Sequence, residues 1–109
     1  MGNVKFDDWK NLDIRVGKVL EVEEHPDADK LFILKVDIGE ENPRNIVSGL
    51  KSYYEIDELV GRKIIVFVNL KPAKFRGVES EGMLLAAEKD DKVVLLDLEK
   101  DIDVGAKIT

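Results

Sequence analysis

The stretch at residues 69–83 carries the side-chain types that contact the backbone of a nucleic acid. Its three cations within six residues suit phosphate oxygens, and its small polar side chains suit phosphate or sugar. Apolar side chains in the same stretch could press on a base, although we expect Phe75 and Met83 to fill the core in preference. Glycines at 77 and 82 allow a close approach. The candidates are Asn69, Lys71, Lys74, Phe75, Arg76, Ser80 and Met83. The alternative interpretation is a β-bulge with tight turns that merely returns the chain.

The chain is acidic overall but basic in one segment. Its net charge of −6 opposes general binding to a polyanion. However, residues 62–78 contain five cations and no carboxylate, whereas residues 88–103 contain seven acids and three lysines. Ordinary fluctuation of charge along a chain is the alternative explanation. We expect the basic segment to form one exposed cationic strip made of Arg62, Lys63, Lys71, Lys74 and Arg76.

Residue patterns for catalysis or metal binding are missing from the sequence. The single histidine, His25, precedes a proline, and no Gly-x-Ser-x-Gly elbow, phosphate-binding loop or calcium loop occurs. The absence of cysteine removes thiolate nucleophiles and thiolate zinc sites. We therefore predict no catalytic residue, no metal and no cofactor, with His25 as a turn residue. No apolar run reaches the roughly 20 residues that cross a bilayer, so we expect a cytoplasmic protein without membrane contact.

Alternating apolar and polar residues predict strands along most of the chain. The first run, at residues 14–23, has Ile14, Val16, Leu20 and Val22 on one face. Gly17 lies within it, where a strand coils or a partner chain comes close. Further strands are expected at residues 32–38, 44–48 and 63–70, with a final hairpin at residues 83–87 and 93–96.

One helix is expected near the middle of the chain, at residues 52–60. Ser52 and Glu55 have capping-box spacing, an apolar stripe follows, and Gly61 suits the left-handed residue that ends a helix. At the N-terminus, Phe6 and Trp9 are spaced by one helical turn. We expect this turn to pack across one end of the fold, with Trp9 filling the core there.

The predicted order of elements is that of an OB-fold, in which three strands are followed by a short helix and then by further strands. We therefore predict one all-β domain with one short helix, spanning residues 1–109, built as a five-stranded barrel with short N- and C-terminal extensions. The C-terminal extension begins at about residue 97. An SH3-like barrel ranks second, because it would lack a helix between its strands.

Four segments together resemble the tRNA-binding domain family. They are residues 13–19 (DIRVGKV), 25–31 (HPDADKL), 46–50 (IVSGL) and the stretch 69–83. The likeness covers nearly the whole chain, from about residue 6 to residue 109. The likeness is specific because all four segments occur in the order that they have in the family. Family members include the C-terminal domain or small subunit of methionyl-tRNA synthetases, and the chain is similar to that type, of the archaeal or bacterial kind.

The resemblance implies an OB-fold that grips the outer corner of a tRNA without reading its anticodon. By motif position, the binding surface would hold Asn69, Lys71, Lys74, Arg76, Ser80 and Met83, with Lys30, Lys35 and Arg44 as flanking contacts. The resemblance also implies a homodimer whose interface uses the termini and the first strand, near Gly17 and residues 97–109.

The implied role is non-catalytic: an accessory domain or subunit that raises the tRNA affinity of a methionyl-tRNA synthetase during translation. A separate catalytic domain or subunit would then carry the ligase activity. Two alternatives stay open. One is a peptide-binding, export-type chaperone of the same fold, and the other is a structural dimerisation module with incidental RNA affinity.

Overall fold

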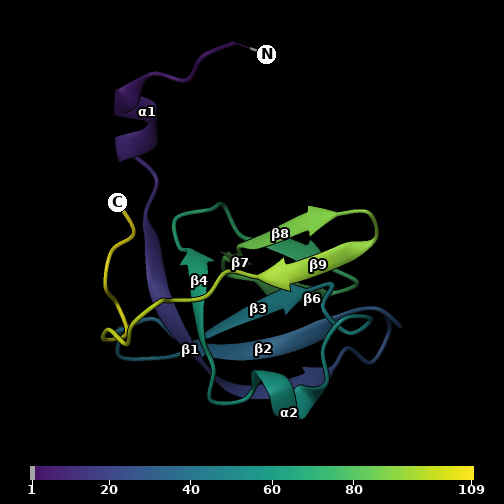
Figure 1. Ribbon diagram of the computed structural model, residues 1–109. Coiled ribbons are helices and arrows are strands. Elements are labelled where there is room, and N and C mark those ends of the chain that lie inside the picture. The colour runs from purple at the N-terminus through teal and green to yellow at the C-terminus, as the bar shows by residue number, and fades with distance from the viewer. Residues whose placement is uncertain (1) are drawn as a thin grey trace.

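The computed structural model describes residues 2–109 (Figure 1). The helices in this range are α1 (Phe6–Lys10) and α2 (Ile56–Leu59). The strands are β1 (Ile14–Glu24), β2 (Phe32–Asp37), β3 (Arg44–Ser48), β4 (Lys63–Phe67), β5 (Ala73–Phe75), β6 (Val78–Ser80), β7 (Met83–Leu84), β8 (Ala86–Lys89) and β9 (Lys92–Leu95). The predicted all-β class is confirmed, with two short helices in the described residues rather than one.

Five of the strands form a nearly closed barrel, as predicted for an OB-type fold. Their order is β3-β2-β1-β4-β7, and every pair is antiparallel. β1 is long enough to pair with β4 along its first half and with β2 along its second half. β3 closes the barrel against the segment between β6 and β7, where the Glu81 amide donates to the Asn45 carbonyl at 2.8 Å.

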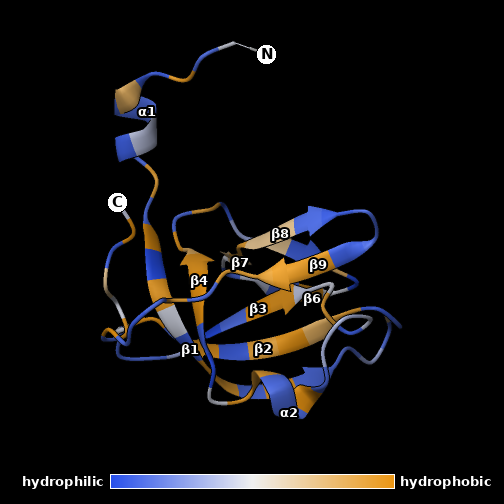
Figure 2. Cartoon of the chain, in the orientation of Figure 1, coloured by the Kyte–Doolittle hydropathy of each residue, from blue (hydrophilic) through white to orange (hydrophobic). Residues whose placement is uncertain are grey.

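The interior of the barrel is aliphatic. Leu34, Ile46, Ile64 and Val66 are fully buried, and Leu59 of α2 joins the same cluster. Alternate residues of β2 (Phe32, Leu34 and Val36) and of β4 (Ile64 and Val66) therefore face the barrel interior. In Figure 2, apolar and polar residues alternate along β1, whereas the arrow of β4 is apolar, as expected for a strand with both faces covered.

β1 departs from the predicted alternation because it contains a β-bulge. Its register against β2 shifts between Val19 and Glu21, so that Val19 before the bulge and Val22 after it both face the barrel cluster, while Leu20 is 40% exposed. Ile14 and Val16 belong instead to a second, smaller apolar cluster. A bulge inserts one extra residue, so the residues after it point to the opposite face of the strand from the one that regular alternation would give. The single apolar face predicted for this run was therefore wrong.

The C-terminal extension covers this second cluster and runs beside the first half of β1. The Gly105 amide donates to the Val16 carbonyl at 2.8 Å, and the Ile108 amide donates to the Ile14 carbonyl at 2.8 Å. The side chains of Ile108 and its neighbours pack against the buried cluster. The part of the β1 edge that β2 leaves unpaired is thus covered by the chain itself.

Gly17 is required by the packing inside the barrel. A Cβ atom there would lie 2.8 Å from Cγ1 of Val36 and 3.1 Å from Cγ2 of Val66. Both neighbours are β-branched and have few alternative rotamers, so they cannot easily move away. The close approach at this glycine is therefore made by the core of the same chain.

α2 begins later than the sequence pattern predicted. Its capping box is formed by Glu55 and Glu58, and the Glu55 amide donates to the Glu58 carboxylate at 2.8 Å. The residues before it form a turn, in which the Tyr53 amide donates to the Leu50 carbonyl at 2.9 Å. Because this turn includes Ser52, a helix cannot start there, and the prediction of a cap at Ser52 was wrong.

α1 projects away from the barrel (Figure 1). None of its residues is buried, and Phe6 and Trp9 are 71% and 42% exposed. The prediction that this turn packs across the barrel with Trp9 in the core was therefore wrong. Helical spacing shows that two apolar residues share one face, but it does not show what that face contacts.

Among residues 2–109, no helix combines the length and the apolar character that crossing a membrane requires. The same part of the chain holds no group of three or more histidine, cysteine, aspartate or glutamate side chains placed to bind a metal ion.

Candidate nucleic-acid interface

The stretch 69–83 contains a small hairpin, β5–β6, that lies outside the five-stranded sheet (Figure 1). Phe75 pairs with Val78, and Arg76 and Gly77 form the turn with φ angles of 51° and 86°. Two successive left-handed residues are typical of the type I′ turn, whose twist matches that of a hairpin. The sequence pattern did not predict this hairpin because Asn or Asp, rather than Arg, usually marks the first turn position.

Three of the predicted phosphate contacts lie exposed at this hairpin. Lys71 precedes β5, Lys74 lies within β5, and Arg76 lies at the turn. None of the three forms an ion pair with any other described residue. Lys74 is in register with Glu79 on β6, where the carboxylate lies beyond ion-pair distance. Their charges are therefore available to a ligand.

Two apolar side chains of the stretch 69–83 are exposed, so the expectation that both fill the core was wrong. Phe75 at the end of β5 lies between Lys74 and Arg76 in the chain and is 37% exposed. Met83 lies on β7, where it pairs with Phe67 of β4, and is 46% exposed. Each offers an apolar surface of the kind on which a base can pack.

Ser80 is buried, although the family motif placed it on the binding surface. Its Oγ donates to the Gly82 carbonyl at 2.9 Å and accepts from the Val47 amide at 3.0 Å. These bonds fasten the base of the hairpin to β3. The hydroxyl therefore holds the hairpin in place and does not face a ligand.

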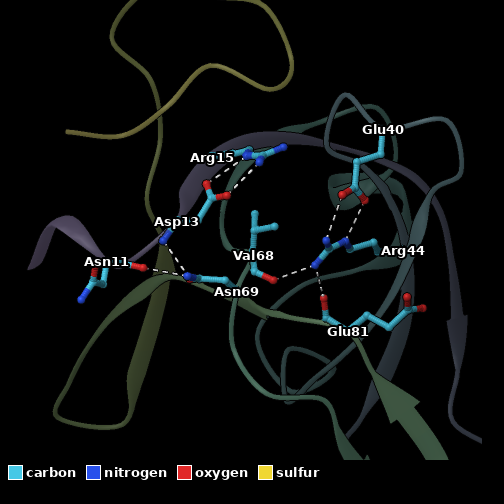
Figure 3. A network of polar contacts seen from close by, with 8 residues as sticks. All are labelled: Asn11, Asp13, Arg15, Glu40, Arg44, Val68, Asn69 and Glu81. Atoms are coloured by element: carbon cyan, nitrogen blue, oxygen red, sulfur yellow. Dashed lines mark hydrogen bonds and ion pairs between the residues drawn. The ribbon is translucent and has the colours of Figure 1, made fainter. Parts of the chain in front are cut away.

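Asn69 also uses its side chain within the fold (Figure 3). Its Oδ1 accepts from the Asp13 amide at 2.8 Å, and its Nδ2 donates to the Asn11 carbonyl at 2.7 Å. These bonds tie the loop after β4 to the linker between α1 and β1. The residue is still exposed, so it can support a ligand contact while fixing the position of the loop.

Arg44 is held inside a polar network (Figure 3). Its Nη1 donates to the carbonyls of Val68 and Glu81 at 2.7 and 3.0 Å. Its Nε and Nη2 donate to the two carboxylate oxygens of Glu40 at 2.9 and 3.0 Å. The guanidinium thereby joins β3 to the segments after β4 and before β7, which leaves little of it free for a phosphate.

Two carboxyl groups in this network have perturbed pKa values. Hydrogen bonds from the Arg44 guanidinium hold the pKa of Glu40 below its usual value of 4.5. Hydrogen bonds from Arg15, whose Nη2 lies 2.7 Å from Oδ2 of Asp13, lower the pKa of Asp13 in the same way. Both groups therefore stay ionised to a lower pH than in an unfolded chain.

The flanking lysines are both exposed. Lys30 lies in the turn before β2, and Lys35 lies on β2 with its Nζ 3.9 Å from a carboxylate oxygen of Glu21. Lys35 also belongs to a groove of about 660 Å³ between the outer face of β1–β3 and the hairpin. The groove is lined by Glu21, Val22, Glu23, Pro26, Ile33, Lys35, Asn45 and Val78.

The five cations of the basic segment do not form one strip. Lys63 lies at the start of β4, and its Nζ pairs with Asp101 at 2.8 Å. The guanidinium of Arg62 lies 5.6 Å from the ring centre of Tyr54. β4 then carries the chain about 16 Å towards the opposite end of the barrel before Lys71 is reached. The predicted convergence was wrong because an extended strand separates residues that are near in sequence.

His25 connects the hairpin to the turn before β2. The ring is 5% exposed, with its Nε2 2.8 Å from the Phe75 carbonyl. Its Nδ1 accepts from the Asp27 amide at 3.0 Å. The sequence pattern places His25 in a turn but indicates no role for its ring, because the Phe75 carbonyl that Nε2 contacts lies 50 residues away.

Comparison with known proteins agrees with this architecture. A family model described as "Putative tRNA binding domain" matches residues 14–107. A methionine–tRNA ligase from Methanococcus maripaludis (strain C5) is 56% identical over 108 residues, which are 99% of this chain and 16% of that protein. The ligase of Pyrococcus horikoshii is 53% identical over 108 residues, 99% of this chain and 15% of that protein. The chain thus spans about 15% of the length of these relatives.

Solved structures share the same fold along the whole chain. A MetRS related protein from Pyrococcus horikoshii has a TM-score of 0.91 and 40% identity, with each chain covered completely. The chaperone CsaA from Bacillus anthracis has a TM-score of 0.88 and 29% identity, covering 99% of this chain and 100% of that chain. From the family match over residues 14–107 and these likenesses, the chain belongs to the tRNA-binding domain family.

Proposed function

We propose that this domain binds structured tRNA through the exposed surface around β5–β6 and contributes no catalytic residue. The observation that carries the proposal is the set of three exposed cations, Lys71, Lys74 and Arg76, which have no ion-pair partner in residues 2–109. Family membership supports tRNA as the ligand. Cations of this kind bind phosphates, which cover the surface of a folded RNA.

In this proposal the cations bind phosphates, and Met83 or Phe75 packs against an exposed base or sugar. Arg76 lies at the tip of the hairpin, where a guanidinium can grip one phosphate through two hydrogen bonds. Phosphate contacts carry no sequence information, so many tRNAs are bound with similar affinity. With about three phosphates neutralised, the logarithm of affinity falls against the logarithm of salt with a slope of about −2 to −3.

The longer relatives suggest where such binding is useful. Because the chain matches only 15% of the Pyrococcus horikoshii methionine–tRNA ligase, we propose that it acts beside a catalytic region, in the same chain or in a partner subunit. Holding a tRNA near that region raises its effective concentration and hence its apparent affinity. This role belongs to translation in the cytoplasm.

A charge-reversal comparison tests the RNA site. The variant Lys74→Glu/Arg76→Glu reverses two hairpin charges, whereas Lys89→Glu/Lys92→Glu makes the same change in net charge on the exposed hairpin β8–β9. Filter binding with mixed tRNA should show detectable affinity for the second variant and none for the first. A DNA hairpin and a single-stranded RNA should bind more weakly than tRNA to the unsubstituted chain. Full tRNA affinity in the first variant, or equal losses in both, would contradict the proposal.

We also propose that a second copy of this chain covers α1, which makes the domain a homodimer. Val4, Phe6 and Trp9 are 76%, 71% and 42% exposed, which is unusual for large apolar side chains on one short segment. A groove of about 340 Å³ adjoins them, lined by Phe6, Trp9, Lys10, Leu12, Lys107, Ile108 and Thr109. Two-fold symmetry would bring the same apolar set from the partner into contact with this groove.

Light scattering tests the dimer directly. The unsubstituted chain should have twice the mass of one chain, and Phe6→Ser/Trp9→Ser should have the mass of one chain with unchanged thermal unfolding of the barrel. Neither side chain contributes to the barrel core, so the substitutions should leave the domain folded. A monomer mass for the unsubstituted chain at working concentration would exclude this interface.

A second candidate function is binding of a basic, extended peptide, as the structural likeness to a chaperone suggests. The groove beside β2 favours it, because its apolar floor is flanked by the carboxylates of Glu21 and Glu23. Competition separates the two functions. A basic unfolded peptide that binds and displaces tRNA would support the chaperone role, whereas tRNA binding that such a peptide leaves unchanged would support the RNA role alone.

A further inference from the structure

We infer that His25 is a positioning residue for the hairpin β5–β6, which its side chain fastens to the turn before β2 so that Arg76 faces the RNA in a fixed place. The inference deepens the proposed function and rests on it. His25 itself touches no ligand in this account. It acts through the backbone of Phe75, the last residue of β5 and the neighbour of Arg76.

Each ring nitrogen of His25 makes one hydrogen bond, and the two bonds together fix which nitrogen carries the proton. Nδ1 accepts from the Asp27 amide at 3.0 Å, so it carries no proton. Nε2 lies 2.8 Å from the Phe75 carbonyl, which can only accept, so Nε2 carries the proton and donates it. The neutral ring with its proton on Nε2 therefore satisfies both contacts at once. At 5% exposure the ring has almost no surface left for a ligand.

The hairpin needs such a fastening because it is small and separate from the barrel sheet. β5 and β6 have three residues each and, among the strands of residues 2–109, pair only with one another. An isolated two-stranded hairpin is at best marginally stable in water. Ser80 holds the base of the hairpin to β3, and His25 holds the end next to the turn. Without the second contact, only the base would fix the direction of Arg76.

The same contact holds together two walls of the neighbouring groove. Pro26 follows His25 in the turn, Val78 pairs with Phe75 in the hairpin, and both side chains line the groove. A hydrogen bond between the two walls thus sets their separation as well as the position of the hairpin tip. Because both elements are already held in place, less conformational entropy is lost when RNA binds.

Two variants separate the two hydrogen bonds of the ring. The side-chain oxygen of His25→Asn can replace Nδ1 as an acceptor for the Asp27 amide, but the shorter side chain cannot reach the Phe75 carbonyl. The amide nitrogen of His25→Gln can replace Nε2 as the donor to that carbonyl, but it offers no acceptor in the Nδ1 position. If His25 acts by positioning, His25→Gln should bind mixed tRNA within about twofold of the unsubstituted chain. His25→Asn should bind about two- to tenfold more weakly, the range set by losing one hydrogen bond.

Hydrogen exchange provides a readout that does not depend on RNA. In His25→Asn, the amides of β5 and β6 should exchange faster while those of β1 and β4 keep their protection. His25→Gln should leave both sets protected. This pattern would support the inference, because a general loss of stability would speed exchange in the barrel as well.

Three outcomes would overturn the inference. One is equal loss of tRNA affinity in the two variants, which would mean that the ring acts by packing alone. Another is unchanged affinity and unchanged hairpin exchange in His25→Asn. The third is a failure of the proposed function itself, which is recognised separately because the unsubstituted chain and Lys74→Glu/Arg76→Glu would then both fail to bind tRNA.

Discussion

Arg44→Met should destabilise the domain without removing its RNA site. Arg44 was expected from the family motif to flank the tRNA, yet its guanidinium makes four hydrogen bonds within the chain. Methionine keeps an unbranched apolar stem that reaches about as far as Nε of arginine, but it removes every donor. The substitution therefore isolates the contribution of the guanidinium to the fold.

The size of the effect follows from what the substitution leaves behind. The carbonyls of Val68 and Glu81 each lose a charge-assisted donor, and leaving such a group unpaired in a partly buried place destabilises by about 1–2 kcal/mol. The pair with Glu40 adds only about 0.5 kcal/mol, because the two side chains are 21% and 40% exposed and solvent screens the attraction. The total is about 2.5–4.5 kcal/mol, a large part of the 5–15 kcal/mol that typically holds a domain folded.

Urea unfolding measures this loss, with Lys35→Met as the matched control. Lys35 is an exposed cation on the adjacent strand β2, and the control should change stability by less than about 0.5 kcal/mol. At a temperature where Arg44→Met is still folded, it should keep nearly full tRNA affinity. Stability within 0.5 kcal/mol of the unsubstituted chain, together with a large loss of tRNA affinity, would refute the reasoning and make Arg44 a direct contact.

Three further predictions concern the turn, the acid response and the barrel. Arg76→Asn should stabilise the domain by up to about 0.5 kcal/mol, because Asn adopts a φ angle of 51° more readily than Arg does. The same substitution should weaken tRNA binding, and equal or higher affinity in filter binding would argue against a phosphate contact. Because the pKa values of Asp13 and Glu40 are lower in the folded chain than in the unfolded one, their stabilisation is complete above about pH 5 and is lost as pH falls through the folded values. Urea midpoints should therefore drop between pH 6 and pH 3, and Glu40→Gln should reduce the drop; a drop of the same size in that variant would contradict the assignment. Gly17→Ala should lower the free energy of unfolding by about 1–3 kcal/mol, because the added Cβ would lie 2.8 Å from Cγ1 of Val36. An unchanged midpoint temperature of thermal unfolding would instead show that the core rearranges to accept the methyl group.

Much of the barrel could be predicted from patterns within single segments. Period-two alternation located β2, β3 and β4, and the hairpin β8–β9 formed between the two arms of the predicted final hairpin, with φ angles of 52° and 64° at Asp90 and Asp91 in its turn. These features depend on neighbours in the chain, so a local pattern contains the needed information. The order of four short motifs likewise identified the family, which the family match confirms.

Other elements depended on contacts that no local pattern records. The bulge in β1 exchanges the two faces of the strand, so that Val22 packs against the barrel cluster although Ile14, an even number of residues before it, lies in the second cluster beside the C-terminal extension. The spacing of Phe6 and Trp9 predicted a helical turn correctly, but its apolar face does not pack on the barrel. Such faces are assigned by tertiary packing.

The sequence by itself determined the barrel strands, the family and the cations that end up exposed at the hairpin. Only the tertiary structure decided which polar side chains serve the fold: Ser80, Arg44 and His25 bond to backbone groups 33, 24 and 50 residues away. A buried polar group must find a hydrogen-bonding partner, and which backbone groups are left unpaired is known only once distant strands have met. A side chain that looks suited to RNA in the sequence can therefore be fully engaged within the protein.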